Sequence, residues 1–352
     1  MSTDPAEPGA TRRQGDESTN RLTLSGSRST LVADHDALLV DLDGVVHLGD
    51  QPIPGAAEAL NHARSGGLTV AYVTNNASRT PADVARSLTA YGLQVAADDV
   101  VTSSVVAARL LAERLPVGAA VLVVGGEGLR APLAAAGLRP VAVADGAQAV
   151  VQGWAPEVGW AQLAEGAVAV RAGAPWVATN LDRTLPSPRG PLPGNGSMVA
   201  ALVSATGREP ESVGKPEPAM FTGAVAAVGA RRPLVVGDRL DTDIAGAGAA
   251  GYPSLAVLTG VSSPRDLLAA GPGERPSYLG RDLGALHIRH EAPTLGDDGA
   301  RCGDVTVSDR GEVSGTSGGD GLDGLRAACA LAWSGRLAPE SHETVLSNLG
   351  LN

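Results

Sequence analysis

Two carboxylates at the end of an apolar run are the first feature of this sequence that could do chemistry. The segment 38–44 reads LLVDLDG, so Asp41 and Asp43 stand directly at the end of the run. A short apolar run before a turn signal indicates a parallel strand, and ligands in open α/β sheets bind beyond the carboxyl ends of such strands. Two carboxylates this close repel each other unless a cation lies between them or one is protonated. The alternative is a solvated Asp-x-Asp-Gly turn.

A second predicted strand ends in the same acidic way. The segment 233–243 reads PLVVGDRLDTD, which places Asp238 and Asp243 just beyond the apolar residues. Because parallel strands end at a common edge of a sheet, we expect the two acidic segments to meet. Carboxylate oxygens are hard ligands of the kind that Mg²⁺ prefers. The sequence therefore predicts a Mg²⁺ site built from both segments.

A polar loop and a single lysine complete the predicted site. The strand 68–73 runs into Thr74, Asn75 and Asn76, and such a loop before a helix suits an anion, although an ordinary capping loop has the same composition. Lys215 is the only lysine among 27 basic residues, which indicates a position that needs a compact ammonium, unless chance left one lysine. Together these groups favour a phosphate ligand. No serine or cysteine in these loops has a neighbouring histidine base, so the available nucleophile is a carboxylate.

The overall composition argues against several classes of partner. A formal net charge of −11 disfavours nucleic acid and membrane surfaces, which both require a basic face. No apolar run approaches the ~20 residues that span a bilayer. Residues 1–30 lack the apolar centre of a signal peptide, so we expect a cytoplasmic protein. Cys302 and Cys329 are too few for a disulfide framework or a zinc site.

The order of predicted elements indicates an α/β fold with a Rossmann-like parallel core and an inserted α/β cap. Strands and helices alternate over 34–116, the alternation restarts over 117–208, and it resumes over 209–282. Residues 1–33 are polar and lack apolar periodicity, which predicts a disordered tail. Residues 283–352 form a Gly-, Asp- and Ser-rich extension of unknown role, with a predicted hairpin around Arg310-Gly311 and a helix over 323–333.

Four motifs in this chain resemble those of the haloacid dehalogenase (HAD) superfamily of phosphatases. They are Asp41-x-Asp43-Gly, Thr74-Asn-Asn, Lys215-Pro and Gly-Asp238-x-x-x-x-Asp243. The inserted module looks like the large α/β cap of class IIA, and the resemblance spans about 36–282. Segments 179–182 and 193–201 look most like actinobacterial D,L-glycerol-3-phosphate phosphatases.

This resemblance implies a phosphomonoesterase for a small phosphorylated metabolite, with glycerol 3-phosphate as the expected substrate. Phosphoglycolate, pyridoxal phosphate, a nucleotide or an aryl phosphate are the alternatives within the class. The alternative from another class is a receiver-like signalling module, which holds an aspartyl phosphate without turnover.

The resemblance also implies a role for each matching residue. Asp41 would be the nucleophile that becomes an aspartyl phosphate, and Asp43 would protonate the leaving alkoxide and then deprotonate the hydrolytic water. Mg²⁺ would be held by Asp41, the Asp43 main-chain carbonyl and Asp238, with Asp243 orienting its waters. Lys215 would neutralise charge on the nucleophile and the phosphate. Thr74 and the main chain of Asn75 would hold phosphoryl oxygens, and the substrate and its phosphate would also be bound by Gly44, Asn76, Asn180, Asp182 and Lys215.

The inserted cap is expected to close over this site. Loops 125–128 and 180–183 are candidates for its pocket-facing segments, or they are turns far from any ligand. His47 either lines the pocket or is structural. We also expect the cap to carry the contact of a homodimer.

Overall fold

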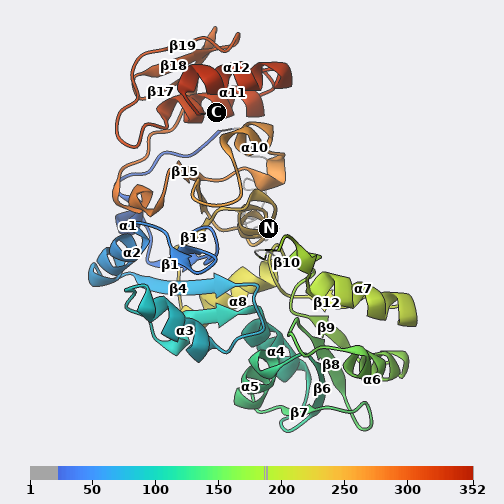
Figure 1. Ribbon diagram of the computed structural model, residues 1–352. Helices are drawn as coiled ribbons and strands as arrows, with labels where there is room; N and C mark the ends of the chain where they lie inside the picture. The colour runs from blue at the N-terminus through green and yellow to red at the C-terminus, as the bar shows by residue number, and fades with distance from the viewer. Residues whose placement is uncertain (1–22, 186, 188, 352) are drawn as a thin grey trace, which may run out of the picture.

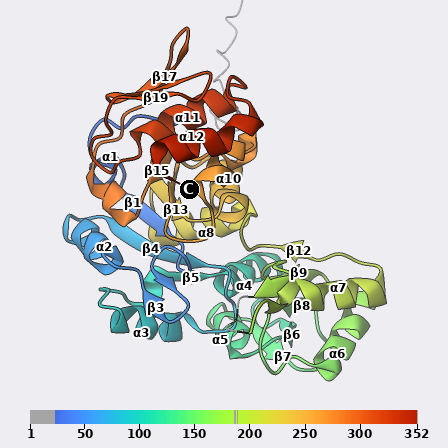
Figure 2. The same cartoon turned by 45° about the horizontal axis from the view of Figure 1, so that its top comes forward.

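The computed structural model describes residues 23–185, 187 and 189–351. A parallel core sheet lies in the middle of the molecule, the cap lies to its lower right, and a C-terminal module lies at the top (Figure 1). Figure 2 shows the same three parts after a rotation, with the cap still on one side of the core. Across the described ranges, no helix is both long and apolar enough to cross a bilayer.

The core is a six-stranded parallel sheet in the order β15-β14-β13-β1-β4-β5. Its strands are β1 (Ala37–Val40), β4 (Thr69–Thr74), β5 (Val100–Thr102), β13 (Pro233–Gly237), β14 (Ser254–Val257) and β15 (Tyr278–Gly280). Central β1 pairs with β13 on one side and β4 on the other, and all four of its residues are buried. A strand covered on both faces must be apolar throughout, which explains the unbroken run in the sequence.

Helices cover both faces of the core sheet. Leu38 and Val40 pack with α2 (Ala56–Ser65) and α3 (Pro81–Ala90). Leu39 points to the other face, because side chains alternate along a strand, and belongs to a cluster with α4 (Ser103–Arg114), α8 (Pro218–Val228) and α9 (Ala245–Ala249). This second cluster continues into the cap through α5 (Glu127–Ala135).

The cap has its own five-stranded parallel sheet in the order β12-β9-β8-β6-β7. The sheet strands are β6 (Ala120–Val124), β7 (Arg139–Val141), β8 (Ala149–Gln152), β9 (Trp176–Ala178) and β12 (Glu211–Ser212). The other elements of the cap, besides α5, are β10 (Thr184–Leu185), β11 (Leu192–Pro193), α6 (Trp160–Arg171) and α7 (Asn195–Thr206). The expected boundary after residue 208 is wrong, because Glu211 and Ser212 pair with Val177 and Ala178 of the cap. A two-residue strand carries too little pattern to be recognised in a sequence.

The expected N-terminal tail extends too far. Residues 1–22 of that prediction lie outside the described residues, but Leu24 and Leu31 are buried and α1 spans Leu31–Asp34. The main-chain N–H of Ser27 donates to the His290 carbonyl at 2.9 Å. Leu24 and Leu31 pack against apolar residues far along the chain. The average composition of the polar N-terminal segment does not indicate such contacts.

The C-terminal module joins a four-stranded antiparallel sheet to α11 (Asp323–Trp333) and α12 (His342–Leu349). The sheet contains β16 (Thr294–Leu295), β17 (Gly299–Cys302), β18 (Val305–Ser308) and β19 (Val313–Ser314). The predicted hairpin around Arg310-Gly311 and the predicted helix over 323–333 are confirmed. The expected end of the core at residue 282 is wrong, since Leu283, Ala285 and Leu286 pack in the core cluster with α2.

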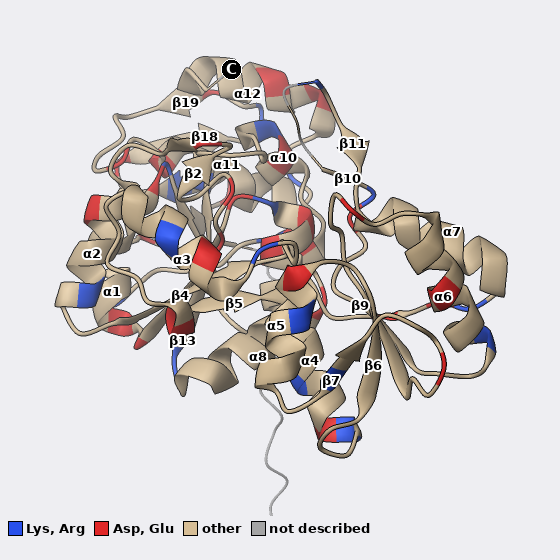
Figure 3. Cartoon of the chain, turned by 60° about the horizontal axis from the view of Figure 1, so that its bottom comes forward, with Lys and Arg blue, Asp and Glu red and all other residues tan. Residues whose placement is uncertain are grey.

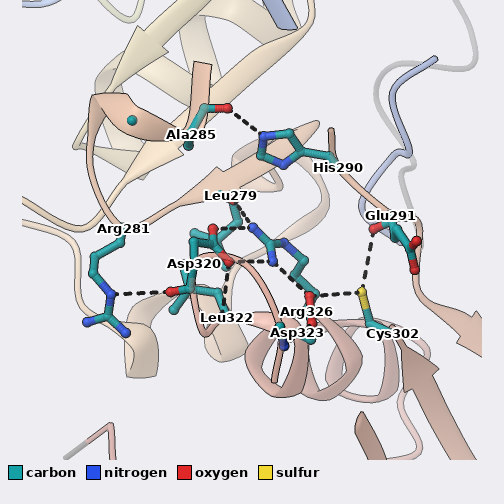
Figure 4. Close-up of polar contacts among 12 residues, drawn as sticks. Leu279, Arg281, Ala285, His290, Glu291, Cys302, Asp320, Leu322, Asp323 and Arg326 are labelled. Carbon is teal, nitrogen blue, oxygen red and sulfur yellow. Dashed lines mark hydrogen bonds and ion pairs between the residues drawn. The ribbon is translucent and has the colours of Figure 1, made fainter. Parts of the chain in front are cut away.

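A buried arginine connects this module to the edge of the core sheet through a hydrogen bond (Figure 4). Arg326 is 4% exposed and donates to the carboxylates of Asp320 and Asp323 and to the Leu279 carbonyl of β15. Burial opposes its charge, but the Asp320 contact outweighs this and raises the Arg326 pKa. On the open edge of β15, the Leu279 carbonyl therefore accepts a hydrogen bond from the Arg326 side chain and not from another strand.

Candidate active site

Three carboxylates meet at the carboxyl ends of β1 and β13. Asp41 directly follows β1, and Asp238 and Asp243 follow β13, with one oxygen of each carboxylate within 4.8 Å of the others. Asp238 is 1% exposed and its Oδ1 has no hydrogen-bond partner among the described residues. A buried carboxylate oxygen without a donor is costly unless a cation or a proton meets it. The predicted meeting of the two acidic segments is thus observed, and its all-oxygen donor set fits Mg²⁺.

The lone lysine lies within the same cluster. Its Nζ is 2.6 Å from Asp41 Oδ1 and 2.7 Å from Asp243 Oδ1, and Lys215 is 6% exposed. Burial lowers the Lys215 pKa, but the charges of Asp243 and Asp41 outweigh burial and raise it. The ammonium is therefore charged at neutral pH and offsets part of the negative charge of the cluster.

Burial shifts the pKa values of the carboxylates upward. It raises the pKa of Asp41 although the Lys215 charge acts in the opposite direction. It raises the pKa of Asp243 to about 6, with a further contribution from the Asp41 charge. It also raises the pKa of Asp238 to about 6, against the hydrogen bond from the Val261 N–H. Without a cation, these groups hold their protons at higher pH than ordinary aspartates do.

Close backbone packing holds Asp238 in place. Gly44 has a φ of +87°, and a Cβ there, or at Gly260, would clash with the Asp238 carboxylate. The Val261 N–H donates to Asp238 Oδ2 at 2.6 Å, and the Thr259 hydroxyl donates to the Gly44 carbonyl at 2.6 Å. The sequence analysis predicts no function for this loop after β14. The only sequence feature that marks it is the Thr259-Gly260 pair just beyond β14.

The side chain of Asp43 lies apart from the carboxylate cluster. It is 58% exposed, its Oδ1 accepts from the Gly49 N–H at 3.3 Å, and it lies 3.8 Å from His47 Nδ1. Gly49 is in the turn between β2 (His47–Leu48) and β3 (Gln51–Pro52), an antiparallel hairpin beside the site. The structure thus directs Asp43 toward this hairpin, and places His47 beside Asp43 and not in the cluster.

Most polar groups of the loop after β4 form hydrogen bonds within the loop itself. The buried Thr74 accepts the Asn76 N–H through its hydroxyl at 3.1 Å. Asn76 is exposed, and its Oδ1 accepts from the N–H and hydroxyl of Ser78. The Gly44 N–H, a candidate phosphate donor, donates to the His47 carbonyl at 2.7 Å. The loop is therefore preformed, with Thr74 at the end of β4 beside β1.

Both candidate cap loops contact this core loop. The Asn180 amide donates to the Asn75 carbonyl at 2.8 Å, and Asp182 accepts from the Asn75 amide at 3.2 Å. A Cβ at Gly128 would clash with the backbone of 77–79, so the other cap loop packs directly on the core. Ser103, which sequence reasoning missed, donates to the Asn75 carbonyl at 2.8 Å from the first residue of α4. A Thr-Ser-Ser run at a strand-to-helix junction was its only signal.

The fold and the cluster define a capped haloacid dehalogenase-like hydrolase. The family model for haloacid dehalogenase-like hydrolases matches residues 38–139, and a HAD-hydrolase-like model matches 212–286. The first match includes Asp41 and the loop at Thr74, and the second includes Lys215 and the acidic segment 238–243. Together with the relatives below, they show that the chain belongs to the haloacid dehalogenase-like hydrolases, so the expected fold class is confirmed.

Characterised relatives match most of the chain. A D-glycerol 3-phosphate phosphatase from Mycobacterium tuberculosis is 51% identical over 318 residues, which is 88% of this chain and 89% of the relative. An acid sugar phosphatase from Staphylococcus epidermidis is 36% identical over 251 residues, covering 71% of this chain and 95% of the relative.

Solved structures give the same grouping. A crystal structure of the glycerol phosphate phosphatase from Mycobacterium tuberculosis in complex with magnesium has a TM-score of 0.79 and 45% identity, over 92% of this chain and all of the other. A p-nitrophenyl phosphatase from Archaeoglobus fulgidus has a TM-score of 0.67 and 32% identity, over 72% of this chain and 98% of the other. The mycobacterial structure therefore matches the chain well beyond the extent of the shorter relative.

Proposed function

We propose that this protein is a Mg²⁺-dependent phosphomonoesterase that hydrolyses glycerol 3-phosphate. The observation that carries the chemistry is the buried Asp41 carboxylate, paired with Lys215 at 2.6 Å beside Asp238 and Asp243. The substrate rests on the 51% identity to a D-glycerol 3-phosphate phosphatase over 88% of this chain. Receiver-like signalling lacks comparable support, because the chain matches hydrolases over most of its length.

Asp41 is the nucleophile in this proposal. Its carboxylate attacks phosphorus in line with the leaving alkoxide, forming an aspartyl phosphate as the ester bond breaks. Lys215 neutralises charge on the nucleophile and on the phosphoryl oxygens, where negative charge is concentrated in the transition state. The Thr74 hydroxyl and the loop through Asn76 lie at the neighbouring strand end and supply contacts to the phosphoryl group.

Asp43 is the general acid and base. It protonates the departing alkoxide, and the resulting carboxylate takes a proton from the water that attacks phosphorus, which releases phosphate and regenerates Asp41. Such proton transfers contribute roughly 10²–10⁴-fold. The Asp43 side chain points to the hairpin of β2 and β3, so this role requires it to rotate toward the cluster.

The residues present fit a bound Mg²⁺. Asp41, Asp238 and the Asp43 main-chain carbonyl would hold it, and Asp243 would orient its waters. Bound Mg²⁺ supplies charge neutralisation for the phosphate and fixes its orientation. The unpartnered Oδ1 of Asp238 is the observation that supports this assignment.

Phosphate release by the purified protein, with and without Mg²⁺, tests the proposal. The panel contains both enantiomers of glycerol 3-phosphate, phosphoglycolate, pyridoxal phosphate, a nucleoside monophosphate and nitrophenyl phosphate. We expect Mg²⁺-dependent multiple turnover with glycerol 3-phosphate hydrolysed fastest. A different leading compound retains the mechanism and removes the substrate. A single phosphorylation without turnover would instead support the receiver alternative.

We further propose a cytoplasmic homodimer that forms through the cap. Trp160 and Val168 on α6 are 83% and 59% exposed. The adjacent α7 has no charged residue, as Figure 3 shows. Exposed apolar side chains beside an uncharged helix favour a protein contact. Light scattering should give twice the mass of one chain, and Trp160→Glu should give one chain mass; a monomeric wild type contradicts the dimer.

A further inference from the structure

Both polar atoms of the Asn75 side chain have partners inside the fold. Its Oδ1 accepts the Lys215 N–H at 2.7 Å, and its Nδ2 donates to the Lys215 carbonyl at 3.0 Å. The same Nδ2 also donates to Asp182 Oδ2 at 3.2 Å. A primary amide has two donor protons and one acceptor oxygen. One side chain therefore binds both main-chain polar groups of Lys215 and one carboxylate of the cap.

The main chain of Asn75 is held as firmly as its side chain. Its carbonyl accepts from the Ser103 hydroxyl in the core and from the Asn180 amide in the cap, each at 2.8 Å. Asn180 is in turn fixed through its own carbonyl, which accepts from the Asn195 amide at 2.7 Å. Asn75 thus has defined contacts to the core on one side and to the cap on the other.

These contacts lie where the chain returns from the cap to the core. The cap sheet ends at Ser212, and three residues later the Lys215 ammonium is between Asp41 and Asp243. A Cβ on the intervening Gly214 would clash with the Thr179 carbonyl, and would lie 2.7 Å from Asn75 Oδ1. The crossing therefore packs directly against Asn75 and the cap and leaves no room for a side chain at position 214.

We propose that Asn75 is a positioning residue that couples the seating of the cap loop at 180–182 to the placement of Lys215. Its amide holds the Lys215 main chain so that the ammonium reaches Asp41 and Asp243, and its contact with Asp182 links that placement to the cap. This inference rests on the proposed function. It gives the Asn75 side chain a positioning role, in addition to the phosphate contact that the family resemblance implied for the Asn75 main chain.

A lysine that stabilises charge in the transition state affects turnover more than substrate binding. Loss of the Asn75 amide displaces Lys215, and misplacements near 1 Å change rates by as much as about 10²-fold. We therefore expect Asn75→Ala to lower kcat by about 10- to 100-fold, with KM changed by less than about threefold. Asn75→Asp is nearly isosteric; it retains the acceptor but loses the donor to Lys215 and adds a charge beside Asp182. It should lower kcat in the same way, and it serves if the alanine variant fails to fold.

Asn61→Ala is the matched control. Its amide also bridges two main-chain groups, donating to the Gly92 carbonyl at 2.8 Å and accepting the Gln94 N–H at 2.9 Å, but it lies on α2 away from the site. Each variant is measured for kcat, KM and amide hydrogen exchange in peptides that cover 179–183 and 212–216. In the Asn75 variants we expect faster exchange in both peptides, whereas in Asn61→Ala we expect neither exchange nor kcat to change.

Two results would overturn the coupling. Unchanged exchange at 212–216 in both Asn75 variants would show that the amide does not hold the Lys215 segment, and this readout does not require activity. A raised KM with unchanged kcat would show that Asn75 binds substrate directly. If the wild type hydrolyses no phosphate ester, the proposed function fails, while the exchange measurement still decides whether Asn75 joins the two segments.

Discussion

At the scale of single residues, the site gathers four charged groups in a nearly dry space. Asp41, Asp238, Asp243 and Lys215 are each less than one-tenth exposed. Burying such groups is tolerated only when they compensate one another, and a single lysine cannot neutralise three carboxylates. The remaining negative charge favours a divalent cation, and the shapes of the individual side chains then determine the chemistry.

Asp41→Asn should abolish turnover while the fold remains intact. The amide has nearly the same shape but is not a nucleophile, so we expect activity to fall by at least about 10³-fold. Phosphate release and circular dichroism measure the two effects. Asp36→Asn is the control, because Asp36 lies at the amino end of the same strand and its carboxylate accepts from the N–H groups of 231 and 232, away from the cluster. Activity of Asp41→Asn within about tenfold of wild type would remove Asp41 as nucleophile.

Lys215→Arg should lower kcat by at least about tenfold although the charge is kept. The planar guanidinium is larger than an ammonium, and Lys215 is held between Asp41 and Asp243 at 2.6 and 2.7 Å. Lys215→Met, measured in the same assay, separates the loss of charge from the change of shape. Wild-type rates in the arginine variant would mean that a lysine at this position is coincidental.

At the scale of elements, short strands and loops carry side chains from distant segments to one edge of the core sheet. The C-terminal module contacts the acidic loop after β13, since its core cluster includes Leu240, which lies within that loop, and Ile244, which follows Asp243. Arg326 connects that module to β15. The module therefore packs against the segment that positions Asp243.

Arg326→Met should lower the free energy of unfolding by about 3 kcal/mol, because it leaves two carboxylates, only 13% and 16% exposed, without their charged partner. Arg326 is 4% exposed and pairs with Asp320 at 2.6 Å. Arg301→Met in the same module is the matched control, since the Arg301–Asp304 pair is largely exposed. Urea unfolding measures both variants. Equal stabilities of the two variants would show that the Arg326 network does not hold the module.

At the scale of the whole molecule, the metal-free protein carries its acidic cluster as a source of instability. Asp238 and Asp243 have folded pKa values of about 6 against an ordinary value of 3.8. The folded state therefore binds more protons than the unfolded state between about pH 4 and 6. Protonation of these carboxylates stabilises the folded state at low pH, and the metal-free protein loses this stabilisation as the pH rises through 6. Mg²⁺ restores stability by neutralising the deprotonated cluster.

Mg²⁺ should accordingly raise the melting temperature more at pH 7.5 than at pH 5. At the lower pH the ion must displace the proton of its ligand Asp238, which weakens its binding. Thermal unfolding with and without Mg²⁺ at both pH values measures the difference. Asp238→Asn should lose most of the shift at pH 7.5, and an equal shift at the two pH values would contradict this linkage.

Local sequence patterns are sufficient to predict the core fold and to group the residues of the carboxylate cluster. Asp41, Thr74 and Asp238 each lie at or just beyond the end of a recognisable apolar strand, and parallel strands bring their ends to one edge, so local patterns suffice to group them. Lys215 was found by its rarity and by its match to a family motif.

The remaining features depend on contacts between segments that are distant in the sequence. The Asn75 amide binds a residue 140 positions away, and Leu24 and Leu31 are buried by segments far along the chain. The cap boundary at Ser212 depends on two pairings with β9, and the direction of Asp43 depends on the turn at Gly49. Such contacts leave no local pattern, because the energy that selects them comes from partners that meet only after the chain has folded.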